Sequence, residues 1–313
     1  MLIKAIKNAG SIAIGGHVRP DGDCVGSCLG LYLYVKEQIP DKQIHVYLES
    51  IPEPFKFLKR ADEIQHEIPA DKSYDLFIAL DCGDKGRLGF SAPLFESAKK
   101  TLCVDHHVSN QAFANENHIE PEESSTSELV YDLLGIANIS KDIAECLYLG
   151  MVHDTGVFRH SCTHPSTMHA VANLMEKGID FTRIITETFD EKTYAQNQIM
   201  GYALVNSQLV LNGRGVAASI SRKTMEEYKV LPKQLDGIVN QLKLTKGADV
   251  AIFMYELEDG SYKVSLRSTE AVDVSTVAGT FGGGGHARAA GVSMNGTVEE
   301  ILTHLLPAIE EQL

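Results

Sequence analysis

The sequence lacks tryptophan, an excess of basic residues and any long apolar run. Acidic residues outnumber basic ones by 42 to 28, so the net charge is −14. Such a chain repels a long polyanion, because tight duplex binding needs a basic stripe that displaces counterions. No stretch reaches the ~18 apolar residues of a membrane span, and residues 1–16 have no signal-peptide pattern. We therefore expect neither a long duplex nucleic acid nor a membrane as partner.

The cysteines also lack any pattern of a disulfide framework or a thiolate metal site. There are 6 of them, none in a C-x-x-C pair, and several lie in apolar runs such as residues 101–104. Buried, reduced thiols and a cytoplasmic location are the expectation. With 313 residues, 44% apolar and 22% charged, the chain is an ordinary globular protein of up to two domains.

The first half alternates short apolar runs with helical patterns, which favours a parallel sheet with helices on both faces. The predicted strands are residues 11–15, 43–48, 75–80 and 101–104, with a helix over 26–38. Residues 125–175 contain no strong strand and predict several helices. Ser127 and Ser140 are predicted N-caps, and Pro165 is predicted to start a third helix.

The second half predicts a smaller α/β domain. Residues 215–221, 249–256 and 261–267 have strand character, and Asp259-Gly260 predicts a hairpin between the last two. A closing helix is predicted over 298–312. The polar helical pattern over 190–209 is typical of a connection. We expect an N-terminal domain over 1–186, a linker helix over 187–212 and a C-terminal domain over 213–313.

Histidines and aspartates follow the predicted strands of the first half. The four polar segments are residues 16–23, 81–84, 105–107 and 153–156, the last after a helical run. Ligands of an open parallel sheet lie beyond the carboxyl ends of its strands. We therefore expect these side chains to share one crevice.

The convergence of carboxylates predicts bound cations. The four are those of Asp21, Asp23, Asp81 and Asp154. Two like charges ~4 Å apart repel by roughly 4 kcal/mol at an effective dielectric constant near 20. Adding the imidazoles of His17 and His106 gives an oxygen and nitrogen ligand set that suits Mn²⁺, with Mg²⁺, Co²⁺ or Fe²⁺ as competitors. A bridging aspartate would hold two metals ~3.5–4 Å apart, as phosphoryl displacement requires.

These segments resemble the motifs of the DHH phosphoesterase superfamily, named for Asp105-His106-His107. The other three segments resemble its first, second and fourth motifs, and residues 282–291 resemble the glycine-rich signature of its associated domain. The resemblance covers nearly the whole chain in the family's order. Length and domain pair resemble the nano-RNase branch, which implies hydrolysis of very short oligoribonucleotides and often of 3′-phosphoadenosine 5′-phosphate.

The resemblance also implies roles for single residues. One metal would take His17, Asp21 and Asp81; the second would take Asp23, Asp81, His106 and Asp154. Asp105 would orient an imidazole. His107 would face the scissile phosphate as a hydrogen-bond or proton donor. A homodimer is a further expectation from the family.

The glycine run over residues 281–286 predicts a turn before a short helix starting near His286. It lacks the Gly-Lys-Ser/Thr end of a Walker loop. Backbone N–H groups of glycines and of a helix N-terminus bind anions. The residues expected to bind a terminal phosphate or base are Gly284, Gly285, His286, Arg288 and Arg267. By resemblance, this domain closes over the substrate and limits its length.

Three alternatives stay open. A type II inorganic pyrophosphatase resembles the first half, but the glycine signature argues against it. A RecJ-type single-strand exonuclease shares both domain types, yet this chain is shorter and acidic. A nucleotide-sensing module with a degenerate site is the non-enzyme alternative, and the intact aspartates and His106 oppose it.

Overall fold

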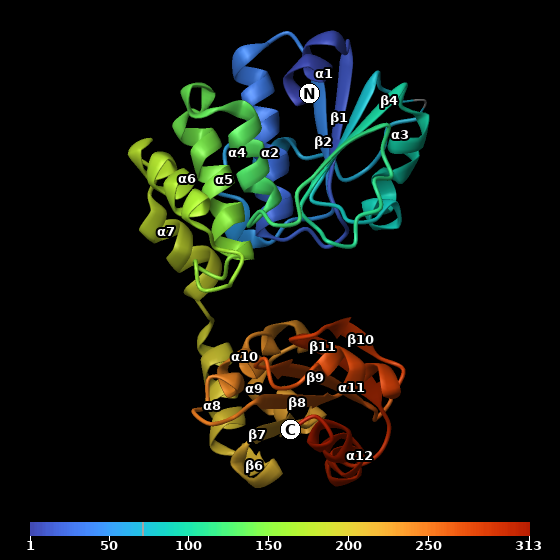
Figure 1. Cartoon of the computed structure of the whole chain (residues 1–313), viewed down its shortest axis with the longest axis vertical. Coiled ribbons are helices and arrows are strands. Elements are labelled where there is room, and N and C mark those ends of the chain that lie inside the picture. Colours follow the sequence, from blue (N-terminus) through green and yellow to red (C-terminus); the bar gives the residue numbers. More distant parts are fainter. Residues whose placement is uncertain (71) are drawn as a thin grey trace. The chain divides into compact units, whose positions relative to one another are not determined.

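The computed structural model describes residues 1–70 and 72–313. The chain forms two compact units, Met1–Glu191 and Lys192–Leu313 (Figure 1). Residues from 192 onward thus belong to the second unit, and a separate linker over 187–212 stays a prediction. Within the described residues, no helix combines the length and apolar character that crossing a bilayer requires.

The N-terminal unit is built on the expected parallel sheet, in the order β2-β1-β3-β4-β5. Its strands are β1 Ser11–Gly15, β2 Gln43–Tyr47, β3 Leu76–Leu80, β4 Lys100–Asp105 and β5 Glu116–Ile119. The first four match the predicted runs closely. The sequence interpretation missed β5, because this short edge strand reads Glu-Asn-His-Ile and carries no apolar run.

Helices cover both faces of this sheet, as predicted. One face packs against the core of α1 Leu2–Asn8, α2 Gly22–Gln38, α4 Thr126–Leu134, α5 Lys141–Asp154, α6 Pro165–Glu176 and α7 Phe181–Ile185. The other face packs against α3 Ala92–Ser97 and the 3₁₀ segment Lys85–Ser91. Alternate strand residues supply the two cores, since successive side chains of a strand point to opposite faces.

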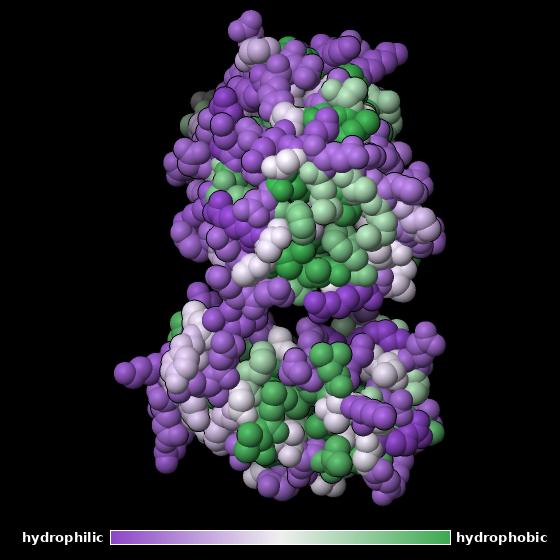
Figure 2. All heavy atoms as spheres, turned by 90° about the vertical axis from the view of Figure 1, so that its left-hand side faces the viewer, coloured by the Kyte–Doolittle hydropathy of each residue, from purple (hydrophilic) through white to green (hydrophobic). Residues whose placement is uncertain are grey.

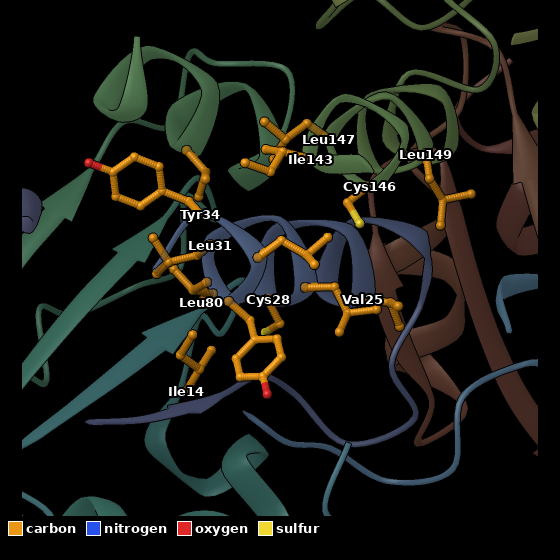
Figure 3. Packing of buried hydrophobic residues seen from close by; sticks show 14 of the residues in the cluster. Ile14, Val25, Cys28, Leu31, Tyr34, Leu80, Ile143, Cys146, Leu147 and Leu149 are labelled. Carbon is orange, nitrogen blue, oxygen red and sulfur yellow. The ribbon is translucent and has the colours of Figure 1, made fainter. Parts of the chain in front are cut away.

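Helix α2 lies between the sheet and α5. Figure 3 shows Ile14 and Leu80 on one side of α2, and Ile143 and Leu147 on the other. Glycine permits the close approach of the two helices: an added Cβ at Gly26 would lie 2.4 Å from the Cys146 carbonyl oxygen. The backbones of α2 and α5 are therefore in direct contact at Gly26. This close packing fixes the positions of the polar residues at the ends of both helices.

Two helix starts differ from the predictions. Helix α2 begins at Gly22 rather than Gly26, because the Asp21 side chain accepts hydrogen bonds from the N–H groups of Asp23 and Cys24. Helix α4 is capped by Ser125 and not by Ser127, which was the wrong choice. The Ser140 cap of α5 and Pro165 at the start of α6 are confirmed.

The C-terminal unit is a mixed sheet in the order β10-β11-β9-β8-β7-β6, also covered on both faces. Its elements are α8 Tyr194–Val205, β6 Gln208–Val210, β7 Gly215–Ile220, α9 Arg222–Tyr228, α10 Ile238–Lys243, β8 Val250–Glu256, β9 Tyr262–Ser268, α11 Val274–Thr280, β10 Gly284–His286, β11 Ala289–Met294 and α12 Val298–Glu310. Helices α11 and α12 pack on one face, and α8 to α10 on the other. The β8–β9 hairpin is confirmed, with Gly260 at a φ of +81° in its turn.

Short helical segments complete the described residues. They are the 3₁₀ segments Glu53–Phe55, Ala61–Glu63, Ile136–Asn138, Leu211–Gly213 and Pro232–Leu235, and the π-helical turn Thr186–Asp190. On the face drawn in Figure 2, hydrophobic residues gather within each unit among hydrophilic ones. Tyr194, Val205 and Leu209 of the second unit are large exposed apolar side chains. The homodimer stays a prediction.

Candidate metal centre

The predicted metal ligands come from the carboxyl ends of β1, β3 and β4 and from the ends of two helices. His17 lies in the loop between β1 and α2, Asp21 caps α2, and Asp23 lies in its first turn. Asp81 directly follows β3, and His106 directly follows β4. Asp154 is the last residue of α5. The close packing of α2 and α5 brings the helical contributions to the edge where the strands end.

Asp81 lies at the middle of this group. Its Oδ2 is 3.3 Å from Nε2 of His17, and its Oδ1 is 3.8 Å from Nε2 of His106. The residue is buried and has a φ of +52°, a left-handed conformation that is costly outside glycine. Each carboxylate oxygen thus faces a different histidine, which is the arrangement that a bridging ligand needs.

Both histidines present the same ring nitrogen to the carboxylates. Nδ1 of His17 donates to the Val18 carbonyl oxygen at 2.8 Å, and Nδ1 of His106 donates to that of Glu123 at 3.2 Å. A carbonyl oxygen only accepts, so the proton of each neutral ring lies on Nδ1. The lone pair of Nε2 is then free for a cation, the usual tautomer of a metal-ligating histidine.

Asp23 and Asp154 complete the group around His106. Nε2 of His106 lies 2.9 Å from Oδ2 of Asp154. The fully buried Asp23 accepts hydrogen bonds from the N–H groups of Thr126 at 2.7 Å and Ser127 at 2.8 Å. A carboxylate has about four lone pairs. Asp23 therefore keeps acceptor capacity for a cation.

The pKa values show how poorly these charges coexist without cations. Burial and the neighbouring Asp81 raise the pKa of Asp23 to about 7. Burial and Asp23 raise the pKa of Asp154 to about 6. Burial alone would lower the pKa of His106, but its carboxylate neighbours raise it to about 10. The group thus holds protons near neutral pH that a divalent cation would replace.

His17 shows the same balance on the other side of Asp81. Burial would lower its pKa, but the hydrogen-bonded carboxylates of Asp21 and Asp81 raise that pKa to about 11. Nε2 of His17 lies 3.5 Å from Oδ1 of Asp21. His17, Asp21 and Asp81 thus form a second cluster of opposite charges, which shares Asp81 with the cluster around His106.

The donor set fits divalent cations. Among residues 1–70 and 72–313, three groups of side chains could each hold an ion, with the ligand atoms of each group within 4.8 Å of one another. They are Asp23, His106 and Asp154; Asp81, His106 and His107; and His17, Cys24 and Asp81. Oxygen and imidazole ligands dominate, as cations such as Mn²⁺ prefer. Cys24 was not predicted as a member; its position one residue after Asp23 is the signal that could have found it.

His107 also lies near Asp81, with its Nδ1 3.7 Å from Oδ1 of that residue, but its shortest carboxylate contact is with Asp105. Its Nδ1 lies 2.7 Å from Oδ1 of the fully buried Asp105, which also raises the pKa of His107. The other oxygen of Asp105 accepts a hydrogen bond from Asn110 at 2.7 Å. This Asn110–Asp105–His107 chain engages Nδ1 of His107 and fixes the orientation of its imidazole.

Sequence reasoning missed the residues that hold the ligands. Asn110, Thr126 and Ser127 were not predicted to take part, although they contact Asp105 and Asp23. The pattern Ser125-x-x-Glu128 before an apolar run is a helix-start signature that could have placed α4 correctly. Asp23, which accepts from the first N–H group of this helix, lies 103 residues earlier in the chain, so no local sequence pattern predicts the contact.

The predicted substrate-binding residues lie around β9 and β10 of the second unit. The short helix expected at His286 is wrong, because β10 pairs with β11 in an antiparallel hairpin. An added Cβ at Gly285 would lie 2.4 Å from the Ala289 carbonyl oxygen, so this close pairing needs glycine. The anion site therefore cannot rest on a helix N-terminus there.

The sheet register nevertheless brings two of these residues together. His286 and Arg267 both stand opposite Ala289, so the three form one row on the same face of the sheet. Nε of Arg267 donates to Asn240 at 3.1 Å. Arg288 lies in the hairpin turn, where its guanidinium donates to the Val272 carbonyl oxygen at 2.8 Å.

Comparison with known proteins agrees with this architecture. Residues 11–151 match the model of the DHH family, N-terminal domain, and residues 212–313 match the model of the DHHA1 domain. The chain is 28% identical to the bifunctional oligoribonuclease and PAP phosphatase NrnA of Thermus thermophilus, over 100% of this chain and 92% of that protein. It is 26% identical to the protein of the same name from Bacillus subtilis, over 94% and 92%.

A solved structure shows the same fold. The crystal structure of an exopolyphosphatase-related protein from Bacteroides fragilis superposes with a TM-score of 0.89 at 29% identity, over 99% of this chain and 94% of that chain. The two domain models, the full-length relatives and this fold agree with the motifs at the sheet edge. The chain belongs to the DHH family of phosphoesterases.

Proposed function

We propose that this protein hydrolyses the phosphate esters of short oligoribonucleotides, from dinucleotides upward, and of 3′-phosphoadenosine 5′-phosphate, using two divalent cations. One observation carries the proposal: the two oxygens of buried Asp81 face two different histidines, 3.3 and 3.8 Å away. The names of the full-length relatives support the substrate class.

The ligands divide into two sets that share Asp81. The first cation is assigned to His17, Asp21 and Asp81, and the second to Asp23, Asp81, His106 and Asp154. Mn²⁺ is the proposed metal, with Mg²⁺ and Co²⁺ as competitors, because the set mixes carboxylate and imidazole. The contact of His106 with Asp154 at 2.9 Å supports the second set.

The side chains around the cations would do the remaining work. Bound cations of this kind lower the pKa of a water and offset charge on phosphoryl oxygens. His107, held through Nδ1 by Asp105, would donate from Nε2 to the scissile phosphate or to the leaving oxygen. Asp105 would keep the imidazole oriented. No covalent enzyme intermediate is required.

The C-terminal unit would bind the rest of the nucleotide. Arg267 and His286 share one row of the sheet, beside Gly284 and Gly285, and Arg288 follows in the turn. Arginine and histidine donors beside glycines suit a terminal phosphate or a base in an otherwise acidic protein.

The six free thiols support a reducing compartment such as the cytoplasm.

A substrate panel with Mn²⁺ tests the proposal. It contains a dinucleotide, longer oligoribonucleotides, 3′-phosphoadenosine 5′-phosphate and pyrophosphate. We expect turnover of the first and third, falling as the oligonucleotide lengthens. Preference for pyrophosphate, or turnover that rises with length, would replace the proposal by a pyrophosphatase or an exonuclease. Nucleotide binding without any turnover would indicate a sensor.

A further inference from the structure

The N-terminus of α4 is buried and entirely polar. Five successive residues, Ser124 to Glu128, are at most 1% exposed. Buried polar side chains usually have hydrogen-bond partners, and within the described residues the Ser127 hydroxyl is the exception in this run. Glu128 accepts hydrogen bonds from the hydroxyls of Ser124 and of Thr167 on α6. The hydrogen bond between Glu128 and Thr167 joins the first turn of α4 to α6 and so fixes the position of this helix start.

The front of this helix start contacts two of the proposed ligands. The first two free N–H groups of α4, those of Thr126 and Ser127, donate to the two oxygens of Asp23. Such N–H groups have no partner within their own helix and favour a negative charge. The Thr126 hydroxyl in turn donates to Oδ1 of Asp81 at 3.2 Å. One residue thus contacts both Asp23 and Asp81.

The Thr126 hydroxyl is closer to Oδ1 of Asp81 than either neighbouring imidazole is. Nε2 of His106 lies 3.8 Å and Nδ1 of His107 3.7 Å from the same oxygen. A bridging carboxylate works only if its plane is fixed, because rotation would turn each oxygen away from its cation. A hydroxyl at 3.2 Å fixes that plane from outside the ligand set.

We propose that Thr126 is a positioning residue of the metal centre: its N–H sets Asp23 and its hydroxyl sets Asp81, so that it controls affinity for the cation these two aspartates share. The inference rests on the proposed pair of cations and goes beyond the ligands themselves. Removal of such an outer contact typically weakens metal binding roughly 10- to 100-fold.

The test compares Thr126→Val with Thr126→Ser. Valine keeps the shape and the backbone N–H but removes the hydroxyl, whereas serine keeps both donors. Metal-free protein is titrated with Mn²⁺, and free Mn²⁺ is followed by electron paramagnetic resonance without substrate. We expect one of two dissociation constants to rise roughly 10-fold or more in Thr126→Val, and both to stay near wild type in Thr126→Ser. If Thr126→Val does not fold, Thr126→Ala takes its place.

Ser125→Ala is the matched control for a merely structural role. It removes the cap of α4, whose hydroxyl accepts from the Glu128 N–H at 3.1 Å, but touches neither aspartate. It should lower the melting temperature and leave Mn²⁺ affinity unchanged. Unchanged affinity in Thr126→Val, or equal losses in all three variants, would overturn the proposal. Since no substrate is present, the result is independent of which nucleotide the protein hydrolyses.

Discussion

Carboxylates and imidazoles at the strand ends stay together only with protons or cations between them. Asp23 and Asp154 have pKa values raised from 3.8 to about 7 and about 6. His17 and His106 have pKa values raised from 6.5 to about 11 and about 10. In each case the folded state binds the proton more tightly than the unfolded state does. Stability of the metal-free protein therefore falls as pH rises, for the aspartates between about 4 and 7 and for the histidines above 6.5.

This balance predicts a pH-dependent effect of metal on the melting temperature. Cations replace the protons, so Mn²⁺ should raise the melting temperature more at pH 8 than at pH 5.5. We expect a difference of roughly 4 °C or more, the shift that about 1–2 kcal/mol produces at this size. Differential scanning fluorimetry with potassium chloride at equal ionic strength as control measures it. Equal Mn²⁺ effects at both pH values would contradict the assignment of these groups as ligands.

The residues of the centre were partly predictable from the sequence. His17, Asp81 and His106 follow predicted strands, and parallel topology alone sends such residues to one edge. Thr126 was not predictable in the same way, because its contact with Asp23 spans 103 residues. A local sequence pattern predicts which residues lie at the end of a strand. It does not predict which helix N-terminus packs against those residues in the folded protein.

At the scale of elements, the packing of α2 against α5 positions the centre. An added Cβ at Gly150 of α5 would lie 2.6 Å from Oδ1 of Asp23, and one at Gly22 would lie 2.3 Å from the ring of His153. Gly22 lies between Asp21 and Asp23 in the sequence, and Gly150 lies one helical turn before Asp154. A Cβ at Gly150 would also lie 1.9 Å from the Ser127 hydroxyl of α4, so a larger residue at either glycine would force the helices around Asp23 to shift.

Two glycine substitutions should therefore have opposite effects. Gly26→Ala sets a Cβ 2.4 Å from a backbone carbonyl oxygen, so we expect a loss of about 1–3 kcal/mol. Gly201→Ala on α8 meets no atom within 4 Å and should stabilise its unit by up to about 1 kcal/mol. Urea unfolding of both variants measures the changes. Changes of the same sign in the free energy of unfolding would show that close helix packing does not determine the effect of these substitutions.

The errors in predicting elements have physical causes. The glycine run is compatible with a turn, a helix start or a strand, and only its pairing with β11 selects the hairpin. Strand β5 has no apolar pattern, because it lies at the edge of the sheet. The apolar strands β1 to β4 and the helices α2 and α12 were predicted within about four residues, whereas α4 to α6 were expected only as several helices without bounds.

At the scale of the molecule, chemistry and substrate binding are assigned to different units. Arg267→Ala or His286→Ala should raise the Michaelis constant for a dinucleotide roughly 10-fold or more, as loss of a charged hydrogen bond does. Hydrolysis of a minimal ester such as bis(p-nitrophenyl) phosphate should change little. Arg222→Ala, which removes an exposed arginine paired with Glu226, is the control. Equal losses on both substrates would place these residues in the chemistry instead.

The most direct test of the two-cation centre is the Mn²⁺ stoichiometry of the whole protein. Wild type should bind two Mn²⁺ per chain, Asp21→Asn should weaken one site, and Asp81→Asn should weaken both and abolish hydrolysis of a dinucleotide. A single Mn²⁺ in wild type, or near-normal binding and turnover in Asp81→Asn, would contradict a centre built around a shared Asp81.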